Sequence, residues 1–452
     1  MDQINEFFKF LNSYLWGPPM LVLLLGTHLF FTFRLRFIQR YTGLGIKLSF
    51  SKDTQGEGDV SHFGALTTAL AATIGTGNIV GVATAVSLGG PGAVFWCWLT
   101  GVFGIATKYA EALLSVKYRV RTSDGTMLGG PMYALERGLR QKWLAILFSV
   151  FTAIAAFGIG NMVQSNSIAN LAQENGGFSP WLTGSVMTVL VALVILGGIR
   201  SIARVCEKLV PFMAVFYTLG CLIILALGYS TVPATLILIV KSAFTGQAAV
   251  GGFAGATVMM AARYGTARGL FSNESGLGSA PIVAAAAQTS HPVRQALVSS
   301  TGTFWDTVVV CAMTGLVLVN TGAWTQGLDG AKLTNAAFHS ITYFGPLILT
   351  VGLLTFVFTT IIGWEYYGER AMEYLFGKKA IWPYRIVWVG AVMVGSVATL
   401  PVVWNFADAA NAMMAIPNLI ALLLLSQVIH KETAAYLWSG QSDHPGNKIG
   451  NQ

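Results

Sequence analysis

The sequence predicts an all-α polytopic membrane protein with eleven transmembrane helices. Three observations support this fold class. Hydrophobic residues make up 54% of the 452 residues and charged residues only 10%, whereas soluble domains carry about 25% charged residues. Apolar stretches long enough to cross a bilayer recur along the whole chain. Two of these stretches are interrupted near their midpoints by glycine-rich segments, at a depth where the backbone has no water to bond.

Each predicted helix corresponds to one apolar run of spanning length, and no run reads as a separate soluble domain. Along the chain we expect these helices at residues 17–37, 62–87, 92–117, 142–170, 180–199, 205–228, 248–287, 294–319, 340–368, 385–402 and 405–430.

The loops rich in Lys and Arg alternate strictly with loops that are nearly bare, and one missed or extra helix would break this alternation. The rich loops therefore face the cytoplasm, which places the N-terminus outside a plasma membrane and the C-terminus inside. Because these charges are dispersed, the net charge of +8 reflects topology, and the expected partner is the lipid bilayer and not nucleic acid. The residues concerned are Arg34, Arg36, Arg40, Lys47 and Lys52; Lys117, Arg119, Arg121, Arg137, Arg140 and Lys142; Arg200, Arg204 and Lys208; Arg294; and Arg370, Lys378, Lys379 and Arg385.

The first interrupted helix carries the run Thr73-Ile74-Gly75-Thr76-Gly77-Asn78-Ile79-Val80-Gly81 in its middle. Irregular backbone at this depth is tolerated where it lines a cavity. A broken helix then offers the N–H groups of one half to an anion and the carbonyls of the other half to a cation. We interpret the run as a binding site; the alternative is that the glycines let two helices pack closely.

The second interrupted helix carries a polar run over 268–281, from Arg268 to Pro281. The two interrupted helices are five helices apart, so they enter the membrane from opposite sides. Two broken helices at corresponding positions of inverted halves indicate a transporter site near the membrane midplane. We therefore expect an extra N-terminal helix and loop (1–60), a first five-helix repeat (61–230), a second, inverted repeat (231–432) and a cytoplasmic tail (433–452).

The chain ends and the cysteines add little chemistry. The first seventeen residues hold a single Lys and no small-residue cleavage site, so no removable signal peptide is expected. Cys97, Cys206, Cys221 and Cys311 all lie in apolar runs without the spacing of a metal site, and we interpret them as packing residues.

Three segments resemble the alanine/glycine:cation symporter family. They are Gly89-Gly90-Pro91-Gly92-Ala93-Val94-Phe95-Trp96-Cys97-Trp98, the run over 268–281, and Trp364-Glu365-Tyr366-Tyr367-Gly368-Glu369-Arg370. The resemblance spans nearly the whole chain. It implies a fold similar to that of leucine-transporter-type carriers and sodium-driven uptake of alanine or glycine, with Na⁺ as the coupled ion.

The first break is the expected centre of the site. Backbone N–H groups within Ile74-Gly75-Thr76-Gly77 would hold the carboxylate of an amino-acid substrate, mainly those of Thr76 and Gly77. The resemblance to related sodium carriers implies sodium ligation by the carbonyls of Ala71, Thr73 and Ile74. The side-chain oxygen of Asn78 would complete one ion site or, alternatively, cap the outer half-helix.

Other helices supply the remaining candidate contacts. Phe271, Ser272 and Asn273 are expected in the second break, where their carbonyls would accept from the substrate ammonium and Phe271 would wall the pocket. Gln164 would contact substrate or bond another helix. Thr359 and Thr360 would ligate a second sodium or bond back to their own helix. Thr360 and Trp364 are also expected beside the substrate, although Trp364 could instead belong to the interfacial aromatic belt.

Charged side chains inside predicted spans leave several alternatives. Lys108 and Glu111 are three residues apart and are expected to pair on one helical face. Glu274 would neutralise the substrate ammonium or pair with Arg263 or Arg268. Asp306 and Asp408 could be gates or proton sites, which keeps proton coupling open.

Two other classes of protein remain to be weighed. A membrane enzyme would gather His, Cys or paired carboxylates in its spans, but the six histidines are scattered, mostly near helix ends. We therefore expect a secondary transporter that works by alternating access, with no catalytic residues and no evident obligatory protein partner. A channel is the third possibility.

Overall fold

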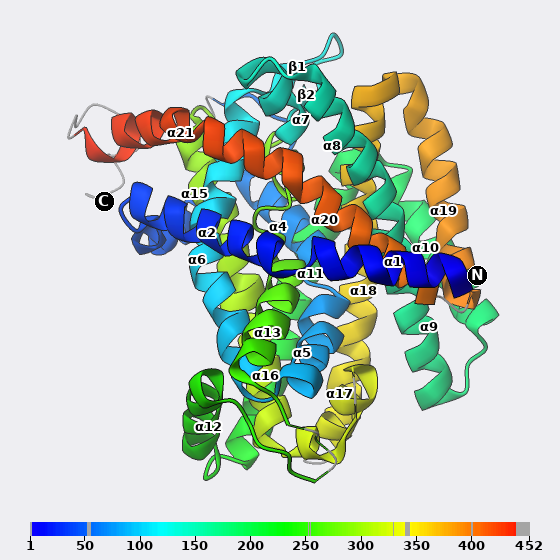
Figure 1. Cartoon of the computed structure of the whole chain (residues 1–452). Helices are drawn as coiled ribbons and strands as arrows, with labels where there is room; N and C mark the ends of the chain where they lie inside the picture. Colours follow the sequence, from blue (N-terminus) through cyan, green and yellow to red (C-terminus); the bar gives the residue numbers. More distant parts are fainter. Residues whose placement is uncertain are drawn as a thin grey trace.

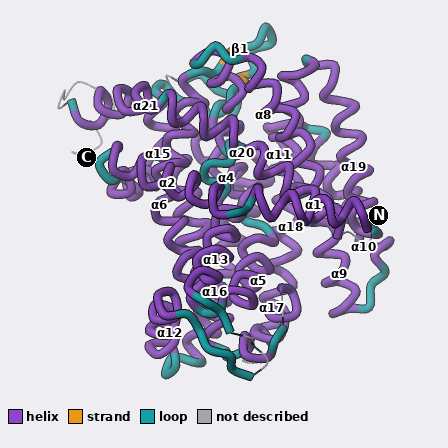
Figure 2. The backbone as a smooth tube through the Cα atoms, in the orientation of Figure 1, coloured by secondary structure: helices purple, strands orange, loops and turns teal. Residues whose placement is uncertain are grey.

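The computed structural model describes residues 2–51, 56–251, 253, 255–328, 330–339, 344–398 and 401–439. The described part is almost entirely helical, with one antiparallel hairpin of β1 (Val120–Arg121) and β2 (Met127–Leu128) (Figure 2). The predicted tail lies outside the described residues from 440 onward.

Short 3₁₀ and π segments, labelled η, interrupt or connect the α-helices. The first half contains α1 (Asp2–Leu15), α2 (Pro18–Arg34), η1 (Ile38–Tyr41), α3 (Thr42–Ser49), α4 (His62–Thr73), η2 (Gly77–Gly81), α5 (Val82–Gly89), α6 (Gly92–Lys117), α7 (Pro131–Tyr133), η3 (Ala134–Gly138), α8 (Lys142–Ala155), η4 (Ala156–Met162), α9 (Val163–Gly176), α10 (Pro180–Ile195) and α11 (Gly198–Leu227). The second half contains α12 (Val232–Thr245), α13 (Val258–Asn273), α14 (Pro281–Ala284), α15 (Pro292–Thr303), η5 (Phe304–Cys311), α16 (Ala312–Asn320), η6 (Ala323–Gln326), α17 (Gly330–His339), α18 (Gly345–Phe376), η7 (Lys378–Ala380), α19 (Ile381–Val397), α20 (Pro401–Leu424), α21 (Ser426–Thr433) and η8 (Ala434–Trp438).

Five helices of the described part are long and apolar enough to cross a membrane, and three bent helix pairs raise this number to eight. The bent pairs are α1 with α2, the two halves of the first interrupted helix, and α20 with α21. The other three predicted spans fall on α6, α10 and α13 with α14. The chain is thus a multi-pass membrane protein, whereas the count of eleven stays a prediction.

The first interrupted helix breaks where the glycine run predicts. Ser61 caps α4 by accepting a hydrogen bond of 2.9 Å from the Gly64 amide. The helix ends at Thr73 because Ile74 adopts an extended conformation, with ψ 93°. The chain then resumes as η2 and α5, bent by 52° from α4. Gly77 is not among the glycines with positive φ, so its backbone conformation does not by itself require glycine.

The second interruption begins later than predicted. Helix α13 continues through Phe271, Ser272 and Asn273, which form its last turn and not the break itself. The helix stops because Glu274 takes a left-handed conformation with φ 56°, which costs a non-glycine residue energy. A linker of turns then leads to Pro281, the first residue of α14. The last-turn carbonyls of α13 still lack helical partners.

The two broken helices pack against each other half by half. Helix α13 contacts α5 and η2, and α14 contacts α4; Figure 1 shows α13 and α5 side by side. At the far end of the α4–α14 pair, the amide of Asp59 donates to the Ala286 carbonyl (2.7 Å) and the amide of Gln288 donates to the Val60 carbonyl (2.7 Å). Each half of one broken helix is therefore tied to a half of the other.

Several elements differ from the sequence prediction. The helices α1, α3, α12 and α17 were not expected, because they are too short or too amphipathic to register as apolar spans. Helices α11 and α18 extend beyond the predicted apolar runs. Arg204 and Arg370, assigned to loops, therefore lie within helices, and so do Arg294 in α15 and Arg385 in α19. Helices α1 and α2 lie across the front of the bundle in Figure 1, where α1 contacts α20 and α2 contacts α6.

Candidate functional site

Two backbone amides of the first break are bonded to side chains instead of to their own helix. The Gly75 amide donates to Asn78 Oδ1 (2.8 Å), and the Thr76 amide donates to Gln164 Oε1 (3.3 Å). In a continuous helix these amides would bond the carbonyls of Ala71 and Ala72. Both carbonyls thus lose their usual donors beside the break. By accepting from the Gly75 amide, the Asn78 side chain caps the start of the outer half-helix, which was one of its two predicted roles.

The two threonines of α18 differ in what they contact. Thr360 Oγ1 donates to the Ile74 carbonyl in the break (3.2 Å). Thr359 Oγ1 bonds back to the carbonyls of Thr355 (3.0 Å) and Phe356 (3.1 Å), which is the alternative noted for this residue. The structure therefore brings Thr360 to the break and keeps Thr359 on its own helix. Thr73 Oγ1 also bonds back, to the Ala69 carbonyl (3.2 Å).

Asp306 of η5 joins the two breaks. Its carboxylate accepts from Asn78 Nδ2 (2.7 Å), from Ser272 Oγ (3.0 Å) and from Thr307 Oγ1 (2.6 Å). The side chain is fully buried, and all three donors are neutral. A buried carboxylate without a bonded cation is costly, so this position suits a cation. Cys311 lies against the same group, 3.2 Å from Ser272 Oγ.

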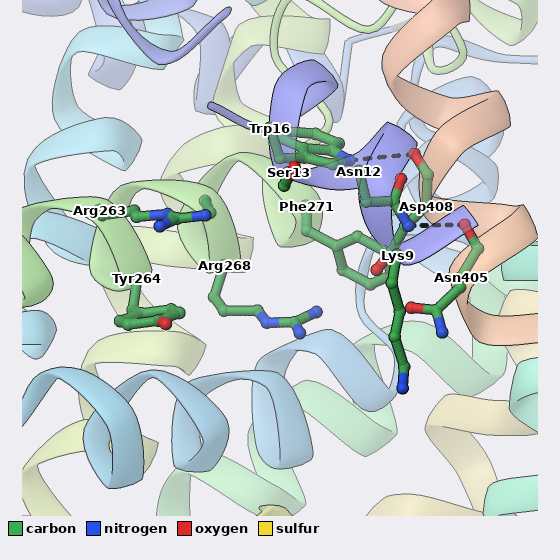
Figure 3. A pocket seen from close by; sticks show the side chains of 11 residues that line it. Lys9, Asn12, Ser13, Trp16, Arg263, Tyr264, Arg268, Phe271, Asn405 and Asp408 are labelled. Atoms are coloured by element: carbon green, nitrogen blue, oxygen red, sulfur yellow. Dashed lines mark hydrogen bonds between the residues drawn. The ribbon is translucent and has the colours of Figure 1, made fainter. Parts of the chain in front are cut away.

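Phe271 separates the first break from an open pocket. A Cβ atom placed on Gly77 would lie 3.3 Å from the Phe271 ring, so the glycine packs directly beneath it. On its other side Phe271 lines a cavity of ≈ 260 Å³ between α1, α13 and α20. Figure 3 shows the ring between Arg268 and Lys9. Asp408, a predicted gate or proton site, lines the same cavity.

Trp364 lies deep in the protein, only 1% exposed. An interfacial aromatic belt requires contact with the lipid surface, so that interpretation is wrong. The indole packs on Gly160 in the π segment η4 and edge-on against Tyr367, with 5.4 Å between ring centroids. Trp364 lies one turn after Thr360, which contacts the first break, and its place beside the substrate stays a prediction.

The linker of the second break is held by Glu111. Its Oε1 accepts from the amides of Gly276 and Gly278 (3.0 Å each) and from Asn418 Nδ2 (2.7 Å). Gly276 and Gly278 have φ 91° and 88°, which glycine adopts without strain. The predicted pairing of Glu111 with Lys108 is wrong, because the carboxylate accepts from backbone amides of the linker instead.

Neither Glu274 nor Lys108 forms, among the described residues, the ion pair that was predicted for it, whereas neutralisation of a substrate ammonium by Glu274 stays a prediction. Glu274 accepts from Ser279 Oγ (2.5 Å) and forms no ion pair with Arg263 or Arg268 within the described residues. Lys108 Nζ has no hydrogen-bond partner among the residues that the structure describes. It lines a cavity of ≈ 10 Å³ with Thr73 and Asn273, the last residues of α4 and α13, about the size of one water molecule.

The polar cluster near Gln164 divides between two tasks. Gln164 reaches the first break, whereas Asn161 Nδ2 donates to the Trp388 carbonyl (2.9 Å) and Asn166 Nδ2 to the Ala398 carbonyl (3.0 Å). The latter two residues bond α19 and its C-cap residue Ala398. Asn273 makes a local turn, accepting from the Ser275 amide (2.9 Å).

The site thus collects Ala71, Ile74, Gly75, Thr76, Gly77, Asn78, Gln164, Phe271, Ser272 and Thr360 around two facing breaks. Sequence reasoning missed the contact of Asp306 with both breaks and the linker bonds of Glu111. Both residues are acids inside apolar helices. Burying a charged side chain in a membrane span costs free energy, so such an acid indicates a functional position.

Two broken helices that face each other near the middle of a helical bundle define a secondary transporter. The sequence profile of the sodium:alanine symporter family matches residues 1–448. The chain therefore belongs to that family, whose shared function is sodium-coupled amino-acid transport.

Individual proteins agree with this assignment. The chain is 55% identical to the sodium/alanine symporter AgcS of Methanococcus maripaludis over 436 residues, 94% of this chain and 95% of the relative. It is 53% identical over 446 residues to an uncharacterized transporter of Haemophilus influenzae, with 98% of each chain covered. The crystal structure of MhsT in complex with L-phenylalanine superposes with a TM-score of 0.60 at 13% identity, over 87% of this chain and 95% of that one. This likeness shows a leucine-transporter-type fold.

Proposed function

We propose that the protein is a sodium-coupled symporter that imports alanine and glycine by alternating access. The observation that carries the proposal is the junction of the two breaks at Asp306, where one buried carboxylate contacts Asn78 of one broken helix and Ser272 of the other. Family membership and the 55% identity to a sodium/alanine symporter support the choice of ion and substrate.

One sodium ion would lie between the breaks. Oxygen ligands suit a hard cation, and Ala71, Asn78, Ser272 and Asp306 supply a carbonyl, an amide oxygen, a hydroxyl and a carboxylate. Asn78 would rotate its oxygen from the Gly75 amide toward the ion. The full charge of Asp306 offsets the charge of the ion.

A second sodium ion would lie between α4 and α18. Thr360 already contacts the Ile74 carbonyl, and the carbonyl of Thr73 is next in the chain. Thr359 was the other candidate ligand, but its hydroxyl bonds the carbonyls of its own helix, so we assign the ion to Thr360. The Thr360 hydroxyl of α18 and the carbonyls of α4 would then bind the same ion.

The substrate carboxylate would take the place of Gln164 at the break. The bond from Thr76 to Gln164 is long, at 3.3 Å, and a charged acceptor at a helix N-terminus is preferred over a neutral one. Thr76 Oγ1 is buried without a hydrogen-bond partner in the described part of the chain and can donate to the same carboxylate. Phe271 and Trp364 would bound the small side-chain space, and the carbonyls of Ser272 and Asn273 would accept from the ammonium.

Alternating access requires a closure on each side of the breaks. Phe271 lies beneath the pocket that α1, α13 and α20 form (Figure 3). We assign this pocket to the outside of the cell. On the opposite side Arg119 donates to the carbonyls of Glu57 (2.8 Å), Ala285 (3.0 Å) and Ala287 (2.8 Å), which ties the two inner half-helices together. Inverted repeats at 61–230 and 231–432 would supply the two closures.

Uptake into proteoliposomes tests the proposal. Purified protein is reconstituted, and labelled alanine and glycine are supplied with a sodium, lithium or proton gradient. Accumulation with sodium alone, together with counterflow of labelled substrate, is expected. Uptake driven equally by protons would contradict sodium coupling, and flux without counterflow would indicate a channel.

A further inference from the structure

An apolar groove of ≈ 430 Å³ runs along the outside of the bundle between α3, α4, α11 and η5. It lies away from the pocket of Figure 3 and shares no lining residue with it. Its outer rim includes Phe50, Val215 and Leu219, which are 72%, 58% and 53% exposed. Its inner wall includes Leu70 and Ile74, which lie at the first break. The groove thus connects the lipid-facing surface with the site.

Two cations mark one end of the groove. Arg204, Lys208, Pro211, Val215 and Leu219 recur at helical spacing along one face of α11. The first two are exposed and form no ion pair within the described residues, while the last three line the groove.

The acidic neighbour of Lys208 is bonded to the start of α4. Glu207 accepts from Ser61 Oγ (3.0 Å) at the start of α4. It therefore leaves the charge of the two cations available to a ligand beside the groove.

The length of the groove matches one leaflet of a bilayer. Leu219 follows Lys208 by eleven positions, or about 16 Å of helix. Half of a bilayer's hydrocarbon core is about 15 Å thick. A lipid whose phosphate lies at Lys208 would therefore reach the level of Leu219 and Ile74 with the end of its acyl chain.

We propose that this groove binds an anionic phospholipid, with one acyl chain between α4 and α11 and the phosphate on Arg204 and Lys208. Anionic lipid is the occupant because the apolar wall requires a hydrocarbon and the two cations require a negative head group. A second copy of the protein could fill the groove only if it brought an apolar segment and a negative charge to the same place.

The lipid would act on the transport site through two shared elements. The π segment η5 presents Trp305 and Val309 to the groove and Asp306 to the breaks. Helix α4 presents Leu70 and Ile74 to the groove, and the Ile74 carbonyl bonds Thr360. An acyl chain in the groove would therefore contact and stabilise both elements that form the proposed ion sites.

Native mass spectrometry of the purified full chain, titrated with phosphatidylglycerol or phosphatidylcholine, tests the proposal without any transport assay. Tighter retention of phosphatidylglycerol is expected. The double variant Arg204→Gln/Lys208→Gln should weaken its binding by about fivefold for each cation removed. Lys379→Gln, which removes an exposed cation elsewhere, serves as the matched control and should bind as the wild type does.

A second pair of variants tests the groove itself. Val215→Trp fills the groove and should abolish phosphatidylglycerol retention, whereas Val189→Trp, at a lipid-facing position of α10 that is 58% exposed, should not. Unchanged retention in both Val215→Trp and the double glutamine variant would overturn the proposal. Equal retention of both lipids by the wild type would also overturn it, as would a protein dimer that Val215→Trp dissociates.

Discussion

Asn78 Nδ2 donates a hydrogen bond of 2.7 Å to the carboxylate of Asp306, and Asn78 Oδ1 accepts one of 2.8 Å from the Gly75 amide. One amide side chain therefore links the backbone of the first break to the buried acid between the two broken helices. If a sodium ion binds here, it competes with the Gly75 amide for the Asn78 oxygen, and it lies beside the substrate carboxylate. Ion and substrate then raise each other's affinity by the same factor.

Replacing Asn78 with alanine should weaken sodium binding by a few kcal/mol, because the ion loses the side-chain oxygen of Asn78 as a ligand. Alanine affinity should fall with it, most visibly at low sodium. The matched variant Asp306→Asn keeps the shape but removes the charge and should reduce sodium affinity further. Alanine binding to purified protein across a sodium titration measures both effects. A variant that loses only about 1 kcal/mol of stability and keeps its sodium dependence would show that Asn78 acts as a cap alone.

Thr360 and Thr359 provide a matched pair on one helix. Thr360→Val removes the hydroxyl that contacts the break, so the apparent sodium affinity of uptake should fall several-fold. Thr359→Val removes a hydroxyl that bonds its own helix and should leave sodium dependence close to that of the wild type. The sodium concentration at half-maximal uptake separates the two. The reverse order would move the second ion site to Thr359, and normal behaviour of both variants would remove it from α18.

The local chemistry of the breaks explains how far the sequence could predict the site. Glycines clustered at the middle of a spanning length predict the first break, because only a lined cavity tolerates irregular backbone there. The second break was placed too early, since the polar residues from Arg268 to Asn273 suggest a loop but still form a helix. Its end depends on the left-handed backbone of Glu274, which no composition rule reveals.

Contacts between distant segments were beyond sequence reasoning. Asp306 and Glu111 were recognised as costly acids, but their partners lie on other helices, and helical spacing within one helix suggested a wrong partner for Glu111. The short helices α12 and α17 also escaped prediction because neither has a spanning apolar run. Periodicity therefore predicted the long helices, whereas the polar connections between them required the structure.

Arg119 should control opening on the side of α4 and α14. Arg119→Gln removes a charged donor to several carbonyls, at a cost of a few kcal/mol, and should favour the state open to the cytoplasm. Labelling of a cysteine at the buried position Ala287→Cys should then become faster from the cytoplasmic side. Arg121→Gln, which removes an exposed pair with Glu57, is the control and should not change labelling, because exposed pairs contribute little. Equal rates in all three proteins would contradict this closure.

The alternation of charged loops predicts the orientation of the chain in the membrane. A tag after Asn5 should be accessible from outside intact cells, and a tag after Gly450, which lies outside the described residues, should not. Accessibility to an impermeant antibody before and after permeabilisation measures both. Matching accessibility of the two tags would contradict the count of eleven spans and the inverted orientation of the two broken helices.

Gly77 tests the break itself, because little space separates it from the second broken helix. A Cβ at this position would lie 3.3 Å from the Phe271 ring and 3.5 Å from the Cα of Ser272. Gly77→Ala therefore requires only a small shift of Phe271 and should keep part of the transport rate.

Gly77→Leu fills the space that the substrate carboxylate must enter and should abolish both transport and alanine binding while the protein still inserts. Sodium-dependent thermal stabilisation of the purified variants separates a blocked substrate site from a collapsed fold, since the ion ligands at Asn78 and Asp306 remain. Transport by Gly77→Leu at the wild-type rate would place the substrate elsewhere.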